Sequence, residues 1–130
     1  MREAVIVSTA RTGLAKSHRG GFNNTGGVAM AGHAIKHSIE RAGIEAKEVE
    51  QVIGGCVTQA GEQAGNVARH SWLTRGDGWH TGGTTVDAQC GSGQQANHLI
   101  RALVAAESID CGIACGVEVM SHVGLGANAI

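Results

Sequence analysis

The strongest constraint on the fold is a strand that runs directly into a helix, over residues 84–106, TTVDAQCGSGQQANHLIRALVAA. Its first five residues, from Thr84 to Ala88, are β-branched, acidic or small and suit a short buried strand. Apolar residues then recur at helical spacing, at Ala96, Leu99, Leu103 and Ala106. The chain must therefore bend sharply between the two elements.

Cys90 lies at this bend and is followed by Gly91, Ser92 and Gly93, whose small size leaves the backbone free to turn. A cysteine in the first turn of a helix is close to unpaired N–H groups and to the positive end of the helix dipole, and both favour the thiolate. The alternative is a small buried hydrophobic residue. The position at a strand-to-helix elbow makes Cys90 a candidate nucleophile.

The rest of the chain predicts an alternation of strands and helices. In chain order we expect a buried strand at 4–7, a loop at 11–27, a helix at 28–42 that Gly43 ends, a strand at 49–55, a helix at 62–74, the strand and helix around Cys90, and a strand at 109–117. The order β-α-β-α-β-α-β predicts an α/β fold with a mainly parallel sheet and helices on both faces. Functional groups in such sheets gather at the carboxyl ends of the strands.

Charge and hydropathy narrow the range of partners. The net charge is −1, and no cluster of Lys and Arg indicates binding to nucleic acid or to a membrane surface. There is no apolar run of 18 residues and no signal peptide at the start, so we expect a cytoplasmic protein without a membrane partner.

The other cysteines and two histidines indicate no metal site. Cys56, Cys111 and Cys115 lack the paired spacings of a zinc site and are expected to be buried thiols, the last two on the same side of one strand. His33 and His37 lie four residues apart on one helix, where a metal pair is geometrically possible, and are expected to be exposed to solvent.

Four stretches together resemble the thiolases, enzymes that cleave or form 3-ketoacyl-CoA. The stretch VDAQCGSGQQA at 86–96 is similar to the thiolase nucleophile motif, and AVIVSTARTGLAK at 4–16, GNVAR at 65–69 and CGVEVMS at 115–121 match in order and spacing. The resemblance covers nearly the whole chain. It implies that Cys90 attacks the ketone carbon and forms an acyl-enzyme, that its backbone N–H donates to the oxyanion, and that coenzyme A is a co-substrate with no tightly bound cofactor.

The resemblance also implies what the chain lacks and how it assembles. Residues 1–118 correspond to an incomplete N-terminal α/β domain, and 119–130 to the start of a loop domain or a truncated tail. The activating histidine and second catalytic cysteine of thiolases come from later motifs, so these 130 residues alone are expected to be inactive. The strand from Thr84 to Ala88 is expected to pair across a two-fold axis in a homodimer or homotetramer.

Three alternatives stay open from the sequence. A non-catalytic thiolase-like fragment or lipid-binding module would keep the fold without the chemistry. A β-ketoacyl synthase relative would use a cysteine at the same elbow. A dinucleotide-binding domain would read the glycines after Cys90 as G-x-G-x-x-A, with Glu118 as the acidic partner of a ribose.

Overall fold

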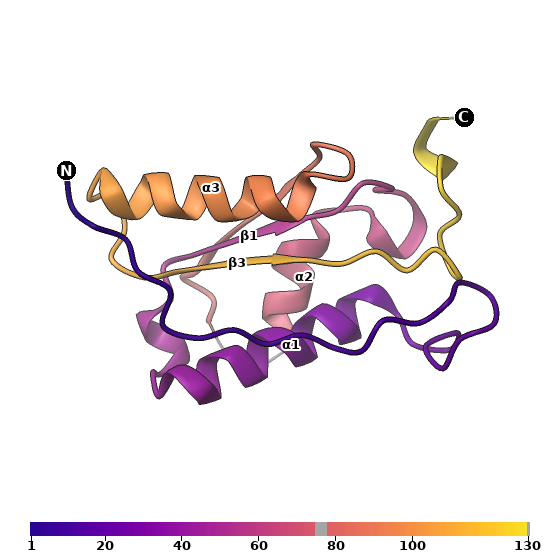
Figure 1. Ribbon diagram of the computed structural model, residues 1–130, viewed down its shortest axis with the longest axis horizontal. Helices are drawn as coiled ribbons and strands as arrows, with labels where there is room; N and C mark the ends of the chain where they lie inside the picture. The colour runs from indigo at the N-terminus through magenta and orange to yellow at the C-terminus, as the bar shows by residue number, and fades with distance from the viewer. Residues whose placement is uncertain (75–77, 130) are drawn as a thin grey trace.

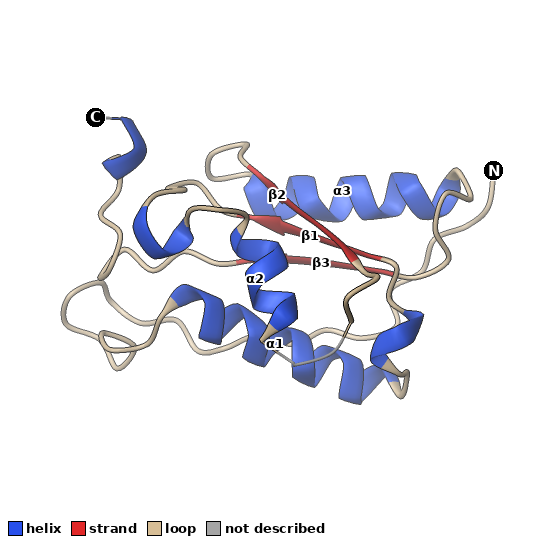
Figure 2. Ribbon diagram, turned by 180° about the vertical axis from the view of Figure 1, so that it is seen from behind, coloured by secondary structure: helices blue, strands red, loops and turns tan. Residues whose placement is uncertain are grey.

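The computed structural model describes residues 1–74 and 78–129. The main elements are α1 (Gly27–Ala42), β1 (Gln51–Gly55), α2 (Val67–Leu73), β2 (Gly82–Val86), α3 (Ser92–Ala105) and β3 (Gly112–Gly116), with short 3₁₀ turns at η1 (Ala46–Glu48), η2 (Gly61–Gln63) and η3 (Ala127–Ala129). The described residues form a three-stranded parallel sheet in the order β2-β1-β3 (Figures 1 and 2).

Helices cover both faces of this sheet, as the sequence predicts. α1 and α2 lie on one face and α3 on the other (Figures 1 and 2). The core between α1, α2 and the sheet consists of side chains no more than 5% exposed, Ile35, Ile39, Val49, Val52 and Trp72. The expected α/β class with a parallel sheet is confirmed.

The first helix follows the prediction closely. Ala31, Ile35 and Ile39 are buried at a spacing of four residues, so one face of α1 packs against the core. The helix ends at Gly43, which adopts the left-handed conformation (φ 69°) that favours glycine.

The prediction of an N-terminal strand at 4–7 is wrong. The segment has no regular secondary structure, and residues 5–7 are each at least 70% exposed. It runs along α1 instead of beside β3 (Figure 1), held where the Ser8 hydroxyl donates to the Ser38 carbonyl at 2.6 Å and where the Arg41 side chain donates to a main-chain carbonyl. Because no strand in the described part of the chain lies alongside it, its backbone has no ladder partner there, and apolar sequence alone does not make it a strand.

Other boundaries shift for local reasons. α2 begins at Val67 and not at 62, because Gly65 (φ 67°) and Asn66 (φ 70°) are in the left-handed region and cannot continue a helix. The strand expected at 84–88 occupies 82–86, and the one expected at 109–117 is confined to 112–116. The shift of β2 leaves residues 87–91 to form the elbow.

The motif at 65–69 joins α2 to β2. The Asn66 amide donates to the Gly83 carbonyl at 2.9 Å and accepts from the Thr85 hydroxyl at 2.8 Å. The Arg69 guanidinium donates to the carbonyls of Trp79 and Thr81 in the segment that leads into β2. These bonds fix the strand that carries the elbow.

The start of α3 lies directly on the end of β1. A Cβ atom added to Gly55 would lie 2.5 Å from the Gly93 nitrogen, closer than real Cβ contacts. One added to Gly116 on β3 would lie 3.6 Å from the Gly93 Cα. The glycine at the end of β1 therefore allows the helix to approach the sheet this closely.

His122 holds the C-terminal segment to the rest of the domain. Its Nδ1 lies 3.0 Å from a carboxylate oxygen of Glu62, and its Nε2 lies 2.6 Å from the Asn23 carbonyl oxygen. The same Glu62 oxygen accepts the Gly27 N–H at the start of α1. The hydrogen bonds to Asn23 and to Glu62 raise the pKa of His122, because the protonated ring can donate to both at once.

We predict that Gly55→Ala destabilises the domain by about 1–3 kcal/mol, because the added methyl group forces the start of α3 away from β1. Urea denaturation measures the loss. Gly21→Ala is the matched control, since an added Cβ there meets nothing within 4 Å. Equal free energies of unfolding for the two variants would contradict the close contact.

We predict that His122→Gln destabilises the domain more at low pH than at high pH. The folded-state pKa is raised above 6.5, so the stabilising contribution is fully present below 6.5 and is lost as the pH rises through the folded-state pKa. Urea midpoints on both sides of this window measure the difference from the unmodified chain. His98→Gln, at an exposed position of α3, is the control, and an equal pH-dependent loss there would refute the assignment.

Candidate active site

The elbow between β2 and α3 holds an unusual backbone conformation. The Asp87 carboxylate accepts the Gln89 N–H at 2.8 Å, and Gln89 has a φ of 52°. A residue other than glycine in this region is strained, and such strain persists only where the surroundings fix it. The next residue, Cys90, is exposed to solvent with a free thiol.

The Ser92 side chain stabilises the elbow with two hydrogen bonds. Its side chain accepts the Ala88 N–H at 2.9 Å and donates to the Gln89 carbonyl at 2.6 Å, and the residue is only 4% exposed. The Gly91 N–H donates to the Ala88 carbonyl at 3.1 Å. From the sequence, only the small size of Ser92 enters the prediction of the elbow. A serine between two glycines at a predicted turn is the signal that could have shown its role, because serine hydroxyls often bond to nearby turn backbone.

The structure corrects the position of Cys90 relative to the helix. The N-cap of α3 is Gly91 and the first helical residue is Ser92, so Cys90 precedes the N-cap and does not lie in the first turn.

The other three thiols are poor nucleophiles. Burial, together with the nearby Glu118 carboxylate, raises the pKa of Cys56 to about 12. Burial raises the pKa of Cys115 to about 11 and also raises that of Cys111. Cys111 and Cys115 pack against the core from the same side, as expected, but both are only partly buried, and Cys111 precedes β3 instead of lying in it. Of the four cysteines, Cys90 alone is exposed.

Glu118 follows β3 and forms hydrogen bonds to the residues that follow β1. Its carboxylate accepts the N–H groups of Val57 at 2.9 Å and Thr58 at 3.1 Å, and the side-chain amide of Gln63 at 3.2 Å. Gln63 is fully buried and also accepts the Val119 N–H at 2.7 Å. Glu118 is thus occupied by backbone amides, and the ribose role considered for it in a dinucleotide site is not supported.

Three kinds of feature would bear on the function: a histidine near Cys90, a metal site and a membrane-spanning helix. Within residues 1–74 and 78–129, no imidazole lies within hydrogen-bond distance of the Cys90 sulfur. In the same part of the chain, no three His, Cys, Asp or Glu side chains are arranged to hold a metal ion. No described helix combines the length and apolar character needed to cross a bilayer.

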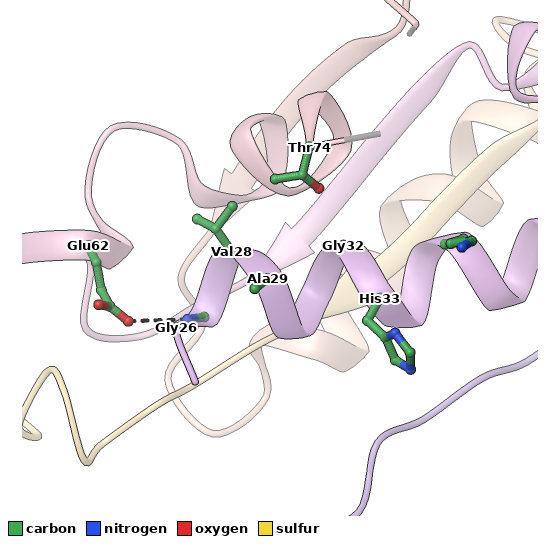
Figure 3. A pocket seen from close by; sticks show the side chains of 9 residues that line it. Gly26, Val28, Ala29, Gly32, His33, Glu62 and Thr74 are labelled. Carbon is green, nitrogen blue, oxygen red and sulfur yellow. Dashed lines mark hydrogen bonds between the residues drawn. The ribbon is translucent and has the colours of Figure 1, made fainter. Parts of the chain in front are cut away.

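Two surface pockets lie along α1, away from Cys90. The first, of about 550 Å³, is lined by the start of α1 together with Glu62 and Thr74 (Figure 3). The second, of about 370 Å³, lies between α1 and the N-terminal segment. Cys90 is not among the described residues that line either of these two pockets.

Known proteins are similar to this chain in sequence and in fold. The family described as "Thiolase, N-terminal domain" matches residues 4–129. The 3-ketoacyl-CoA thiolases of Psychrobacter sp. (strain PRwf-1) and Acinetobacter baumannii (strain ATCC 17978) are 36% and 37% identical over 124 residues, which are 95% of this chain and 32% of each relative. The chain therefore spans about a third of the length of these relatives.

A solved structure agrees with the sequence matches. The crystal structure of the Bacillus anthracis acetyl-CoA acetyltransferase superposes with a TM-score of 0.87 at 30% identity, over 93% of this chain and 30% of that one. The family match spans nearly all of the chain and includes the elbow around Cys90. The chain belongs to the thiolase family, to whose N-terminal domain it corresponds.

Proposed function

We propose that this chain supplies the nucleophile of a thiolase reaction, with Cys90 as the residue that carries the acyl group. The observation that supports this most is an exposed thiol at a hydrogen-bonded elbow, at the carboxyl end of a parallel sheet, in a chain whose three other thiols are buried or partly buried. Residues 1–118 would form the N-terminal domain and 119–130 the approach to a loop domain.

The proposed reaction has two steps. The Cys90 thiolate attacks the ketone carbon of a 3-ketoacyl-CoA, and the bond between that carbon and the α-carbon then breaks. Its electron pair goes to the α-carbon of acetyl-CoA, which takes a proton, while the shortened acyl group stays on the sulfur as a thioester. The thiolate of a second coenzyme A then attacks this thioester and releases Cys90.

The backbone around Cys90 is the proposed source of charge stabilisation. The Cys90 N–H would donate to the oxyanion that forms on the attacked carbonyl, a contribution of about 3–4 kcal/mol in other acyl-transfer sites. The bonds of Ser92 and Asp87 that hold Gln89 in its strained conformation would keep this donor in place before substrate arrives. The acid and base for proton transfer would come from residues beyond those of this chain, so the chain alone would accept an acyl group slowly and would not turn over.

We also propose that two copies associate through β2. This strand pairs with β1 along one side, and in the described residues its other side faces no strand. An open strand edge readily pairs with an identical strand of another copy. The cytoplasmic location expected from the sequence stays a prediction.

The acyl-enzyme is testable on the chain itself. We predict that excess acetoacetyl-CoA or acetyl-CoA adds one acetyl group to the chain, which the mass of the intact denatured protein measures. Peptide mapping after digestion should locate this group at Cys90. Cys90→Ala should abolish the adduct, and Cys111→Ser should retain it. An adduct that persists in Cys90→Ala would contradict the proposal that Cys90 carries the acyl group.

Association through β2 predicts a dimer in sedimentation equilibrium. Thr84→Glu should shift the chain toward the monomer, because a two-fold axis through the exposed edge brings like charges close together. Ser108→Glu adds the same charge at an exposed position after α3 and should leave the dimer intact. A monomeric unmodified chain would count against the strand pairing without affecting the role of Cys90.

A further inference from the structure

Basic side chains belong to four of the nine described residues that line the smaller pocket beside α1. It has a volume of about 370 Å³ and lies between the N-terminal segment and the solvent side of the helix. Its walls include Arg11, Phe22, His33, Ala34, His37 and Arg41. None of the described residues that line it is acidic, although the chain as a whole carries a net charge of −1.

The two arginines of this pocket lack a carboxylate partner. Arg11 donates from Nη1 to the Thr12 carbonyl, and Arg41 donates from Nη1 to the Thr9 carbonyl, each at 2.8 Å. Among the described residues, neither guanidinium forms an ion pair. A guanidinium has five N–H donors, so each arginine is anchored by one and keeps the others for a ligand.

Glu40, the residue before Arg41 in α1, is engaged by other side chains of the helix. Glu40 lies 3.0 Å from the His37 Nδ1 and 4.0 Å from the Lys36 Nζ, and it does not line the pocket. The rings of His33 and His37 lie edge to face with centroids 4.5 Å apart. In Figure 3, His33 points to the side of α1 away from Thr74. The charge of the two arginines is therefore not neutralised from within the pocket.

These features match a phosphate group better than a single carboxylate. Two guanidinium groups complement a dianion, and their planar arrangement of donors suits phosphate oxygens. A phosphate monoester carries a charge of about −1.5 to −2 at neutral pH. The pocket is also larger than one phosphate requires, and the Phe22 ring, about 3.9 Å from a Cβ added at Gly13, supplies an apolar wall.

We propose that this pocket binds a small phosphate monoester, with Arg11 and Arg41 as the partners of the phosphate and Phe22 beside its organic part. The site is separate from the thioester chemistry, because it lies beyond α1 on one face of the sheet, whereas α3 covers the opposite face. It does not depend on a catalytic role for Cys90.

The test is a titration of the unmodified chain with inorganic phosphate and, separately, with adenosine monophosphate, at constant ionic strength set with sodium chloride. Phe22 is the sole phenylalanine and the chain has no tyrosine, so the NMR signals of its ring report on the pocket directly. We expect saturable shifts of these signals with both ligands, and tighter binding of the monophosphate. Saturation by inorganic phosphate alone would keep the anion site and overturn the organic part of the proposal.

Variants separate this pocket from general surface charge. Arg11→Gln and Arg41→Gln should each weaken binding about 10- to 100-fold, as expected for loss of a charge-assisted hydrogen bond. Ala34→Glu keeps both arginines and should weaken binding by placing a carboxylate in the pocket. Lys36→Gln removes one positive charge from the same helix outside the pocket and should bind as the unmodified chain does. No saturable shift in the unmodified chain, or an equal loss in Lys36→Gln, would overturn the proposal.

Discussion

The contact between the start of α3 and the end of β1 is the constraint on which the candidate site depends. Gly55 lets the backbone of Gly93 approach the strand at a distance that no side chain would allow. The chain leaving β2 must then reach a helix that begins almost on the sheet, within the few residues between Val86 and Ser92. The left-handed conformation of Gln89 is the local consequence, and it leaves Cys90 exposed.

The polar network around this contact explains how an exposed thiol can have a fixed position. Asp87 and Ser92 satisfy the backbone of the two residues that precede Cys90, while Glu118 satisfies the amides that follow β1. Buried or strained backbone without such partners would cost free energy that favours other conformations. The same carboxylate of Glu118 contributes to the raised pKa of Cys56, so the network that supports the elbow also keeps a neighbouring thiol protonated.

Much of this arrangement could be predicted from the sequence because it rests on local patterns. The apolar spacing along α1 and the glycine that ends it gave nearly the observed helix, and the residues around Cys90 indicated the elbow. The strand at 4–7 could not be judged in this way, since strand formation requires a neighbour whose presence apolar residues do not reveal. The role of Glu118 was missed for a related reason, because its partners lie about 60 residues away.

The exposed N-terminal segment has a further consequence for the pocket beside α1. Because residues 5–7 pair with no strand, the segment follows the helix, and this course brings Arg11 close to Arg41. The two positive charges repel each other unless solvent or a ligand screens them. A hydrogen bond to a main-chain carbonyl limits how far each guanidinium can move away from the other. A bound dianion would replace this repulsion by attraction on both sides, so it would hold the segment against α1 as well as fill the pocket.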